Sequence, residues 1–304
     1  MSMRIAMHEF ETAPVRDIGS GGVAIVGTVF DDRGAAAHEF LRSSAFQLVE
    51  ATYDPQSFEV IVDGTRRVAD EANEMFDSYL SEPLVLEATT LGIPEIIFVC
   101  HAARERSVQQ LRMLYVEPRR YANPRRDHVL HKRDFELSDE FPGFMPIPGH
   151  VFNLSDPRPT RGIFFLGFED RRLDRALEDH QMIDPQQCGL VFGVPAFKPG
   201  WEMNSFARNI RVIRDKALRS ELFYCGAENP AAAYAVLKKV RDSLSAQERM
   251  FIAPLGTKPN GIGAALFCAE HDNIGLLYDH PRRRTKRSED VSRWHVFEAF
   301  FISP

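Results

Sequence analysis

The amino-acid sequence predicts an α/β protein built from two tandem Rossmann-like modules with parallel sheets, related by internal duplication. Two observations lead to this prediction. Short apolar strand patterns alternate with helical patterns along most of the 304 residues, which is typical of a parallel sheet covered by helices on both faces. A series of short motifs also occurs twice in the same order, once in each half of the chain.

The first module is predicted at residues 21–120, after an N-terminal extension at residues 1–20 that lacks clear periodicity. Its first strand is the apolar run 23–30, a pattern expected for a strand buried on both faces. The elements expected after it are a helix at 35–43, strands at 47–53 and 58–62, a helix at 65–80, a strand at 84–88, a helix at 94–106 and a strand at 111–116.

Residues 121–160 differ from both modules, because a basic stretch is followed by three prolines within seven residues. We expect a connector on the surface there. The second module, at 161–304, repeats the alternation and ends in a C-terminal strand at 293–302 suited to a sheet edge. Its other predicted elements are strands at 162–167, 189–193, 250–253 and 274–278, and helices at 172–180, 201–219, 230–243 and 262–271.

Four ordered matches between the halves indicate the duplication. They are Phe30–Arg33 with Phe168–Arg171, Thr90–Pro94 with Pro254–Pro259, Cys100 with Cys268, and Leu114–Pro118 with Leu277–Pro281. The matched loops should lie at the carboxyl ends of the strands, where open α/β sheets bind ligands. We therefore expect a ligand-binding cleft between the modules or between subunits.

The composition excludes several classes of protein. Hydrophobic residues make up 44% of the chain and the formal net charge is −6, so no global charge favours nucleic acid or an anionic membrane. No apolar run reaches the ~18–20 residues of a membrane-spanning helix, and the N-terminal segment has acids where a signal peptide is apolar. We expect a cytoplasmic protein without metal or cofactor. Its four cysteines lack zinc spacing, and three of them lie beside or within apolar stretches, which is typical of reduced, buried thiols.

The loop Leu255–Gly263 is the strongest candidate for ligand binding. Gly256 lets the backbone approach a ligand, Thr257 offers a hydroxyl and Lys258 adds a positive charge. The helix expected to follow begins with backbone amides and a positive dipole, which suit a phosphate. The spacing is not that of a Walker A loop. The alternative is a helix cap with a solvated lysine.

The run Gly256-Thr257-Lys258-Pro259 resembles the Gly-Thr-Lys-Pro signature of CRISPR-associated Rossmann fold (CARF) domains and related sensors of prokaryotic immunity. Pro254, Leu255 and Asn260 depart from the family pattern Thr-Gly-Gly-Thr-Lys-Pro-Met. Residues Thr89, Thr90 and Gly92 of the first module look like a further-diverged copy without the lysine. The resemblance implies a homodimer that binds cyclic oligonucleotides at these loops, in some members with cleavage. No separate effector domain is visible in the sequence, so we expect signalling through a separate effector protein.

The paired turns after the first strands contribute Asp31, Arg33, Asp170 and Arg171 as candidates. Acids in this position can bind a metal or a ribose hydroxyl, and arginine can hold phosphate. A duplicated helix N-cap with a local ion pair explains the same residues. The closing strands end in Glu117, Asp279 and His280, which suit an acid/base pair facing the cleft or an ordinary strand exit.

The loop at 195–206 has no counterpart in the first module. Lys198, Trp201, Asn204 and Arg208 can reach a base or a phosphate, since stacking on a base is worth ~1–3 kcal/mol. Trp201 can equally anchor the start of the helix. The basic runs 119–133 and 282–287 suit a polyanionic partner or a solvated loop, and His128 and His131 form only a weak metal pair.

Hydrolase, zinc-enzyme, dinucleotide-binding and kinase signatures are absent from the sequence. Three functions remain. The first is a nucleotide-binding sensor of antiviral defence. The second is an enzyme that hydrolyses a phosphodiester or nucleotide in the same cleft, with Asp31, Asp170, Glu117, Asp279 or His280 as acid, base or metal ligand. The third is a scaffold that binds protein through the tail and the proline-rich connector.

Overall fold

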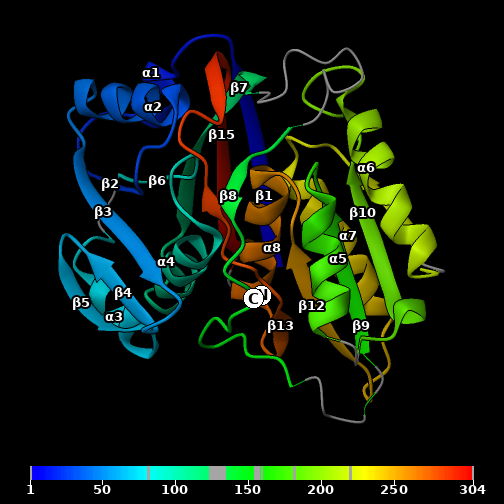
Figure 1. The fold of residues 1–304 in the computed structure, drawn as a ribbon. Coiled ribbons are helices and arrows are strands. Elements are labelled where there is room, and N and C mark those ends of the chain that lie inside the picture. Colours follow the sequence, from blue (N-terminus) through cyan, green and yellow to red (C-terminus); the bar gives the residue numbers. More distant parts are fainter. Residues whose placement is uncertain are drawn as a thin grey trace. The chain divides into compact units, whose positions relative to one another are not determined.

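The computed structural model describes residues 2–80, 83–122, 135–153, 158, 160–180, 183–218 and 221–302. The chain divides into two compact units, and we describe each by itself. Unit 1 combines Met1–Tyr121 with Thr285–Pro304, and unit 2 is Ala122–Arg284. Both units are α/β (Figure 1), as the alternating sequence pattern predicts.

Unit 1 contains a mixed sheet with the strand order β1-β15-β7-β6-β2-β3-β4-β5 among the described residues. Its parallel centre is β3 (Gln47–Asp54), β2 (Val23–Val26), β6 (Leu84–Glu87) and β7 (Gln110–Tyr121). Antiparallel strands flank this centre, namely β15 (Ser288–Ile302) and β1 (Ser2–Phe10) on one side and β4 (Glu59–Val62) and β5 (Thr65–Val68) on the other. The expectation of a purely parallel sheet is therefore wrong for unit 1.

Four α-helices of unit 1 connect its strands within the described residues: α1 (Val15–Ile18), α2 (Asp32–Ser43), α3 (Ala72–Asp77) and α4 (Ile93–Glu105). Helix α2 buries Phe40 and Leu41 in a core cluster that includes Trp294 of β15. The Trp294 ring lies edge-on to Phe40, with 5.4 Å between the ring centroids. The helix expected at 65–80 is instead a strand, a short 3₁₀ turn (Ala69–Glu71) and α3.

The two chain ends differ from the sequence-based expectation. Residues 2–10 form strand β1 rather than an aperiodic extension, and the C-terminal strand belongs to unit 1 rather than to the second module. Figure 1 shows β15 in red beside β7 and β1. The alternating pattern of β15 identifies a strand, but its pairing partner is set by the open edge of β7. Because β7 is distant from β15 in the sequence, no residue near β15 indicates this pairing.

Unit 2 contains a parallel sheet with the strand order β11-β10-β9-β12-β13 among the described residues. In chain order this is 3-2-1-4-5, an arrangement found in doubly wound α/β folds. The strands are β9 (Thr160–Leu166), β10 (Cys188–Gly193), β11 (Glu221–Cys225), β12 (Arg249–Pro254) and β13 (Ile274–Leu276). The helices are α5 (Asp170–Asp179), α6 (Trp201–Asp215), α7 (Pro230–Ser243) and α8 (Lys258–Glu270).

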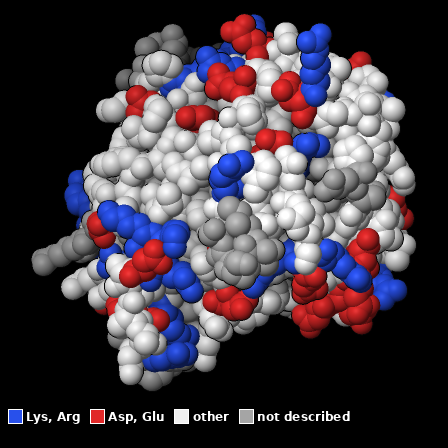
Figure 2. Space-filling view, turned by 180° about the vertical axis from the view of Figure 1, so that it is seen from behind, with Lys and Arg blue, Asp and Glu red and all other residues white. Residues whose placement is uncertain are grey.

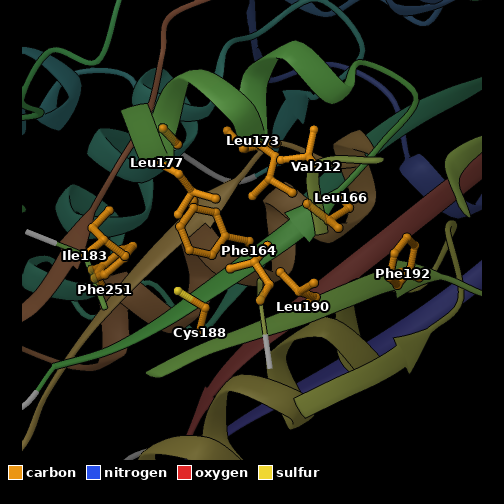
Figure 3. Close-up of a cluster of buried hydrophobic side chains, with 14 residues drawn as sticks. Phe164, Leu166, Leu173, Leu177, Ile183, Cys188, Leu190, Phe192, Val212 and Phe251 are labelled. Atoms are coloured by element: carbon orange, nitrogen blue, oxygen red, sulfur yellow. The ribbon is translucent and has the colours of Figure 1, made fainter. Parts of the chain in front are cut away.

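One face of this sheet packs against α5 and α6 through a cluster of apolar side chains (Figure 3). Leu173 and Leu177 of α5 contact strand residues such as Phe164 and Phe251 there. Helices α7 and α8 pack against each other, where Gly263 allows a close approach because a Cβ would lie 2.4 Å from the Pro230 carbonyl oxygen. Right-handed crossovers place the α7–α8 pair on the other face of the sheet.

The connector predicted at 121–160 packs into unit 2 instead of running over its surface. Its described part buries Phe135, Ile147 and His150, and its strand β8 (Ser138–Glu140) pairs with β14 (Arg282–Arg283). The amide of Leu276 donates to the His150 carbonyl at 3.0 Å. The segment is packed and not exposed because the apolar residues between its prolines cover β12 and β13.

The expectation of buried, reduced thiols is confirmed. All four cysteines are buried and free, and burial raises the pKa of Cys188 and Cys225 to about 12. Within the described ranges, we find no helix with the length and apolar character that crossing a membrane requires.

Candidate functional site

Each unit has a carboxyl edge where the loops following its parallel strands gather. The predicted site residues fall into two sets. Unit 1 holds Asp31, Arg33, Thr89, Thr90, Gly92 and Glu117, and unit 2 holds Asp170, Arg171, Lys198, Trp201, Asn204, Gly256, Thr257, Lys258, Asp279 and His280.

In unit 2 the direction of winding reverses between β9 and β12, which is the place where doubly wound sheets bind ligands. The loops after these two strands lie close together. A Cβ on Gly256 would lie 3.3 Å from the Leu166 carbonyl oxygen, and a Cβ on Gly167 would lie 3.1 Å from the Leu255 carbonyl oxygen. Both glycines therefore allow the two loops to approach each other at the switch point.

Thr257 is the N-cap of α8, and its hydroxyl accepts a hydrogen bond from the Asn260 amide. The same hydroxyl donates to the Ala227 carbonyl at 2.6 Å. Asn260 donates from Nδ2 to the Gly226 carbonyl at 3.0 Å, so these two residues tie the β12–α8 loop to the β11–α7 loop. The Thr257 hydroxyl acts as a structural cap, and Lys258 provides the positive charge at the first residue of the helix.

Trp201 begins α6 and packs against aromatic rings of unit 2. Its ring centroid lies 5.4 Å from that of Phe135 and 6.2 Å from that of Phe168. Lys198 Nζ lies 5.5 Å from the Trp201 ring centroid. This is the anchor that the sequence offered as the alternative to base stacking.

Asn204 and its neighbours in α6 line the loop after β9. Ser205 Oγ and Asn209 Nδ2 both donate to the Gly167 carbonyl at 2.9 Å. Asn204 is only 6% exposed, and its Nδ2 has no hydrogen-bond partner among the described residues. A buried donor without a partner is costly, and because Nδ2 is closed to solvent, no ligand can reach it in this arrangement of the side chain.

The turn at Glu169–Arg171 serves mainly to hold neighbouring elements. Glu169 accepts hydrogen bonds from the Leu137 and Ser138 amides at 3.0 and 2.9 Å. Asp170 lies 3.8 Å from Arg208 and 3.6 Å from Arg211, which links α5 to α6. Arg171 is exposed.

The arginine that sequence reasoning missed is its neighbour, Arg172. It is 6% exposed and faces Asp279, which is 2% exposed. Arg172 Nε and Nη2 donate to the two carboxylate oxygens at 2.7 and 2.6 Å, and Nη1 donates to the Leu255 carbonyl at 2.9 Å. His280 Nε2 donates to the Met145 carbonyl at 3.0 Å, and burial lowers the pKa of this histidine. Asp279 is thus part of a buried bidentate ion pair.

In unit 1 a buried cluster around Asp31 holds α2 against β7 and β15. Arg33 donates to Asp31 at 2.7 Å and to the Val116 carbonyl at 3.3 Å, and Ser288 donates to Asp31 at 2.7 Å. Burial alone would raise the pKa of Asp31, but Arg33, Arg287 and Ser288 outweigh it and hold the pKa well below its ordinary value of 3.8. Asp31 and Arg33 are therefore bound to each other within the chain.

This cluster predicts how the stability of unit 1 depends on pH. A depressed carboxyl pKa contributes stability above the unfolded-state pKa of about 4, and that stability is lost as the pH falls toward the folded-state pKa. We expect Asp31→Asn to lower the free energy of unfolding by about 3 kcal/mol at pH 7, and the difference from wild type to shrink below about pH 4. Urea unfolding read by Trp294 in a Trp201→Phe background measures it.

The exposed neighbour supplies the control, because Asp32→Asn is expected to change stability by less than about 0.5 kcal/mol. An Asp31→Asn effect that stays constant from pH 7 to 3 would contradict the assignment of a depressed pKa.

Thr89 and Thr90 are also bound inward, to a carboxylate that the sequence analysis did not single out. Glu87 is fully buried and accepts hydrogen bonds from the Thr89 and Thr90 amides at 2.8 and 2.9 Å and from the Thr90 hydroxyl. His38 Nε2 lies 3.3 Å from Thr90 Oγ1. The sequence feature that could have indicated Glu87 is an acidic residue at the end of an otherwise apolar strand. Gly92 caps α4, where a Cβ would meet the Glu95 carboxylate.

Glu117 pairs with a histidine of the C-terminal strand. His295 Nε2 lies 3.2 Å from Glu117 Oε2, and both side chains are buried. The partner lies 178 positions away in the sequence, so no local motif could indicate it.

Within the described residues, the basic run 282–287 does not form a field of one sign. Arg282 pairs with Glu140 at 2.8 Å, Arg284 with Glu136 at 3.4 Å, and Arg287 with Asp31 at 3.4 Å. Figure 2 shows acidic and basic side chains lying next to each other over the visible face. Most of the run 119–133, including His128 and His131, lies outside the described residues.

Comparison with known proteins adds no family to these observations: no family model matches the chain, and no curated protein matches it.

Proposed function

We propose that this chain is a nucleotide-binding sensor, with a ligand site at the carboxyl edge of unit 2. The observation that supports it best is the position of the α8 N-terminus and Lys258 at the point where the strand order reverses, between β9 and β12. The positive end of a helix dipole and an ammonium group there favour a phosphate-bearing ligand.

Other features of the same edge support a ligand with a polar base or sugar in addition to phosphate. The Asn204 amide lacks a partner within the described chain and belongs to the α6 turn that binds the Gly167 carbonyl. Because Asn204 is buried, its side chain would bind a ligand only after turning outward. Lys198 lies in the loop that precedes α6, and Arg208 lies in α6 itself. The ligand role of Thr257 is limited to shaping the loop, because its hydroxyl already donates to Ala227.

The correspondence of the two units supports the proposed duplication. In unit 1 the strands β3-β2-β6-β7 occur in the same relative order as β10-β9-β12-β13 in unit 2. Gly27 follows β2 and lies against the loop after β6, because a Cβ there would be 2.6 Å from the Thr90 carbonyl oxygen. Gly167 follows β9 and lies against the loop after β12 in the same way. Two Rossmann-like modules descended from one, similar to CARF domains, account for both similarities. A cytoplasmic homodimer that signals to a separate effector in antiviral defence completes the proposal.

The enzymatic alternative receives less support from the side chains. Asp31, Asp170, Glu117 and Asp279 each lie within an ion pair or hydrogen bond of the chain itself. A general acid or base needs access to the substrate, and residues engaged in this way are better suited to holding the fold. This favours binding over turnover.

Thermal unfolding with mono-, di- and cyclic oligonucleotides tests the proposal, using protein stripped of co-purified ligand. A ligand at about 100 times its dissociation constant adds ~2.7 kcal/mol and raises the midpoint by several degrees. Lys258→Ala should weaken binding at least about tenfold, because a hydrogen bond to a charged group is worth ~1.5–3 kcal/mol. Lys238→Ala, on the exposed face of α7, should leave the affinity unchanged.

Mass spectrometry of each sample separates the alternatives. An intact ligand with a raised midpoint is the expected result, whereas a consumed ligand would establish the enzyme. If no nucleotide raises the midpoint, the nucleotide proposal is wrong and the scaffold becomes the leading function.

A further inference from the structure

An open pocket of about 670 Å³ lies along helix α2 in unit 1. Its size falls within the range of roughly 300–1,000 Å³ that small-molecule sites occupy. The described walls come from the loop after β2 and from one side of the helix, and they are Val29, Ala35, His38, Glu39, Arg42 and Ser43. His38 is only 7% exposed, whereas the other described wall residues are exposed. A buried polar side chain is therefore built into the wall of this pocket.

His38 is held through its Nε2 atom, which faces a polar cluster behind the pocket. This atom lies 3.3 Å from Thr90 Oγ1 and 3.8 Å from Oε2 of the fully buried Glu87. Thr90 Oγ1 accepts a hydrogen bond from the Gly27 amide at 2.9 Å and gives its single hydrogen to Glu87. Because that hydrogen is used, the bond between Thr90 and His38 needs a proton on His38 Nε2.

A proton on Nε2 makes the other ring nitrogen of His38 a hydrogen-bond acceptor. Burial lowers the pKa of His38 more than Glu87 raises it, so the ring is neutral at pH 7 and its Nδ1 carries a lone pair. Nδ1 has no hydrogen-bond partner in the described part of the chain. It is also not one of the unpartnered side-chain atoms there that are closed to solvent. Nδ1 is therefore accessible, and the pocket is the open space that His38 lines.

Arg42 supplies a positive charge one helical turn further along the same side of α2. Side chains four residues apart in a helix lie about 5–6 Å from each other at Cβ, so one ligand can contact both His38 and Arg42. The Arg42 guanidinium has no ion pair or hydrogen bond with any residue that the structure describes, and this group favours phosphate. Glu39 adds a carboxylate to the wall, which accepts hydrogen bonds and repels a bare anion. The wall thus combines one cation with two acceptors.

We propose that this pocket binds a small phosphate ester with free hydroxyl groups, its phosphate on Arg42 and one hydroxyl donating to His38 Nδ1. A bare oxyanion would satisfy only Arg42, and an uncharged sugar would satisfy only the acceptors. Free sugar phosphates and the ribose phosphate of nucleotides share the required chemistry. The site does not rest on the function proposed for unit 2, because none of its described wall residues belongs to the loop Leu255–Lys258.

Ribose 5-phosphate is the probe that tests the proposal. Ribose and methyl phosphate are the matched molecules that lack the phosphate and the free hydroxyl groups, respectively. The full chain is labelled with ¹⁵N-histidine, and the ring signals of His38, identified by their absence from the His38→Gln spectrum, are followed by NMR. We expect the proton on Nε2 before titration and a saturable shift of the Nδ1 signal with ribose 5-phosphate. Both partial molecules should bind about tenfold more weakly, since each loses one set of hydrogen bonds.

Adenosine 5′-monophosphate, titrated in the same way, distinguishes the two sources of the ligand. Tighter binding than that of ribose 5-phosphate would identify a nucleotide, and weaker binding would identify a free sugar phosphate. Either result, with a saturable shift of the His38 signal by ribose 5-phosphate, supports the site.

Three variants locate the site. Arg42→Ala should weaken ribose 5-phosphate at least about tenfold and leave the affinity for ribose unchanged. The matched control is Arg16→Ala, which removes an exposed arginine of α1 in the same unit and should change neither affinity. Lys258→Ala should leave the response of His38 unchanged, so a failure of the nucleotide proposal for unit 2 and a failure of this proposal are distinguishable.

The proposal is wrong if ribose 5-phosphate produces no saturable shift of the His38 signal up to about 20 mM. It is equally wrong if Arg42→Ala binds this probe as tightly as the wild-type chain, or if the proton of the neutral ring lies on Nδ1. Calorimetry with the wild-type and Arg42→Ala chains decides the question even if the His38→Gln chain does not fold, because Arg42 is exposed.

Discussion

Deletion of residues 285–304 is expected to unfold unit 1 while unit 2 remains folded. Strand β15 lies between β7 and β1 and pairs with both. It also buries Trp294, Val296, Phe297 and Phe301. At about 1.5–3 kcal/mol for each fully buried large apolar side chain, the loss is on the order of 10 kcal/mol, comparable to the whole stability of a typical domain.

The tryptophans make this deletion simple to follow. The chain has two, Trp201 in unit 2 and Trp294 in unit 1. The shortened chain keeps only Trp201, whose fluorescence should still show a cooperative urea transition, while amide hydrogens of β2 and β6 should exchange without protection. Protected amides in β2 and β6 would contradict the prediction.

Two point variants distinguish the effect of disrupting β15 from the effect of shortening the chain. Val296→Asp places a charge in the core and should unfold unit 1 in the full chain. Arg293→Ala, whose side chain is half exposed, should change stability by less than about 0.5 kcal/mol. The deletion also cannot serve as a test of the scaffold hypothesis, because it removes a core strand and not a free tail.

Arg172→Met is expected to lower the stability of unit 2 by about 3–5 kcal/mol, the usual cost of removing one partner of a buried ion pair. The Asp279 carboxylate would remain at 2% exposure without its bidentate donor. Arg171→Met changes the adjacent exposed residue and should cost less than about 0.5 kcal/mol. Both are measured by urea unfolding in a Trp294→Phe background, with Trp201 as the reporter.

A double variant shows whether the cost comes from the unpaired charge. Arg172→Met combined with Asp279→Leu removes both partners, so it should be more stable than Arg172→Met alone, because no buried carboxylate is left behind. Equal stability of the single and double variants would mean that Arg172 acts through packing. Equal effects of Arg171→Met and Arg172→Met would exclude a special role for the buried pair.

The sequence pattern predicts the elements that bury both faces or that begin at a clear cap. The apolar runs of β2, β9 and β12 are examples. Helix α8 is also predicted, although it begins at Lys258, directly after its cap Thr257, and not at the expected residue 262. These features depend on neighbours within a few residues. The carboxyl-edge position of the Gly256 loop is predicted for the same reason, since strand and helix alternate around it.

Long-range pairing accounts for what the sequence did not show. Nothing near β15 indicates that it joins β7, and nothing near Asp279 indicates whether Arg171 or Arg172 faces it. The rotation of α5 about its axis determines which arginine faces Asp279. Two adjacent arginines at the start of a helix do not reveal that rotation. The partner of Glu117, His295, lies far along the chain, so the sequence could not show that Glu117 is paired. For Asp31 the sequence offered the local pair with Arg33, which the structure contains, but not the distant contact with Ser288.

The discontinuity of unit 1 imposes an order on folding during synthesis. All of unit 2 is encoded between β7 and β15, so a ribosome adding about 5–20 residues per second needs on the order of ten seconds to supply the missing strand. All strands of the five-stranded sheet of unit 2 have been synthesised before β15. Until β15 arrives, the edge of β7 is an open template for pairing with another chain, which makes the interval between these strands the period when nascent chains are most exposed to misassembly.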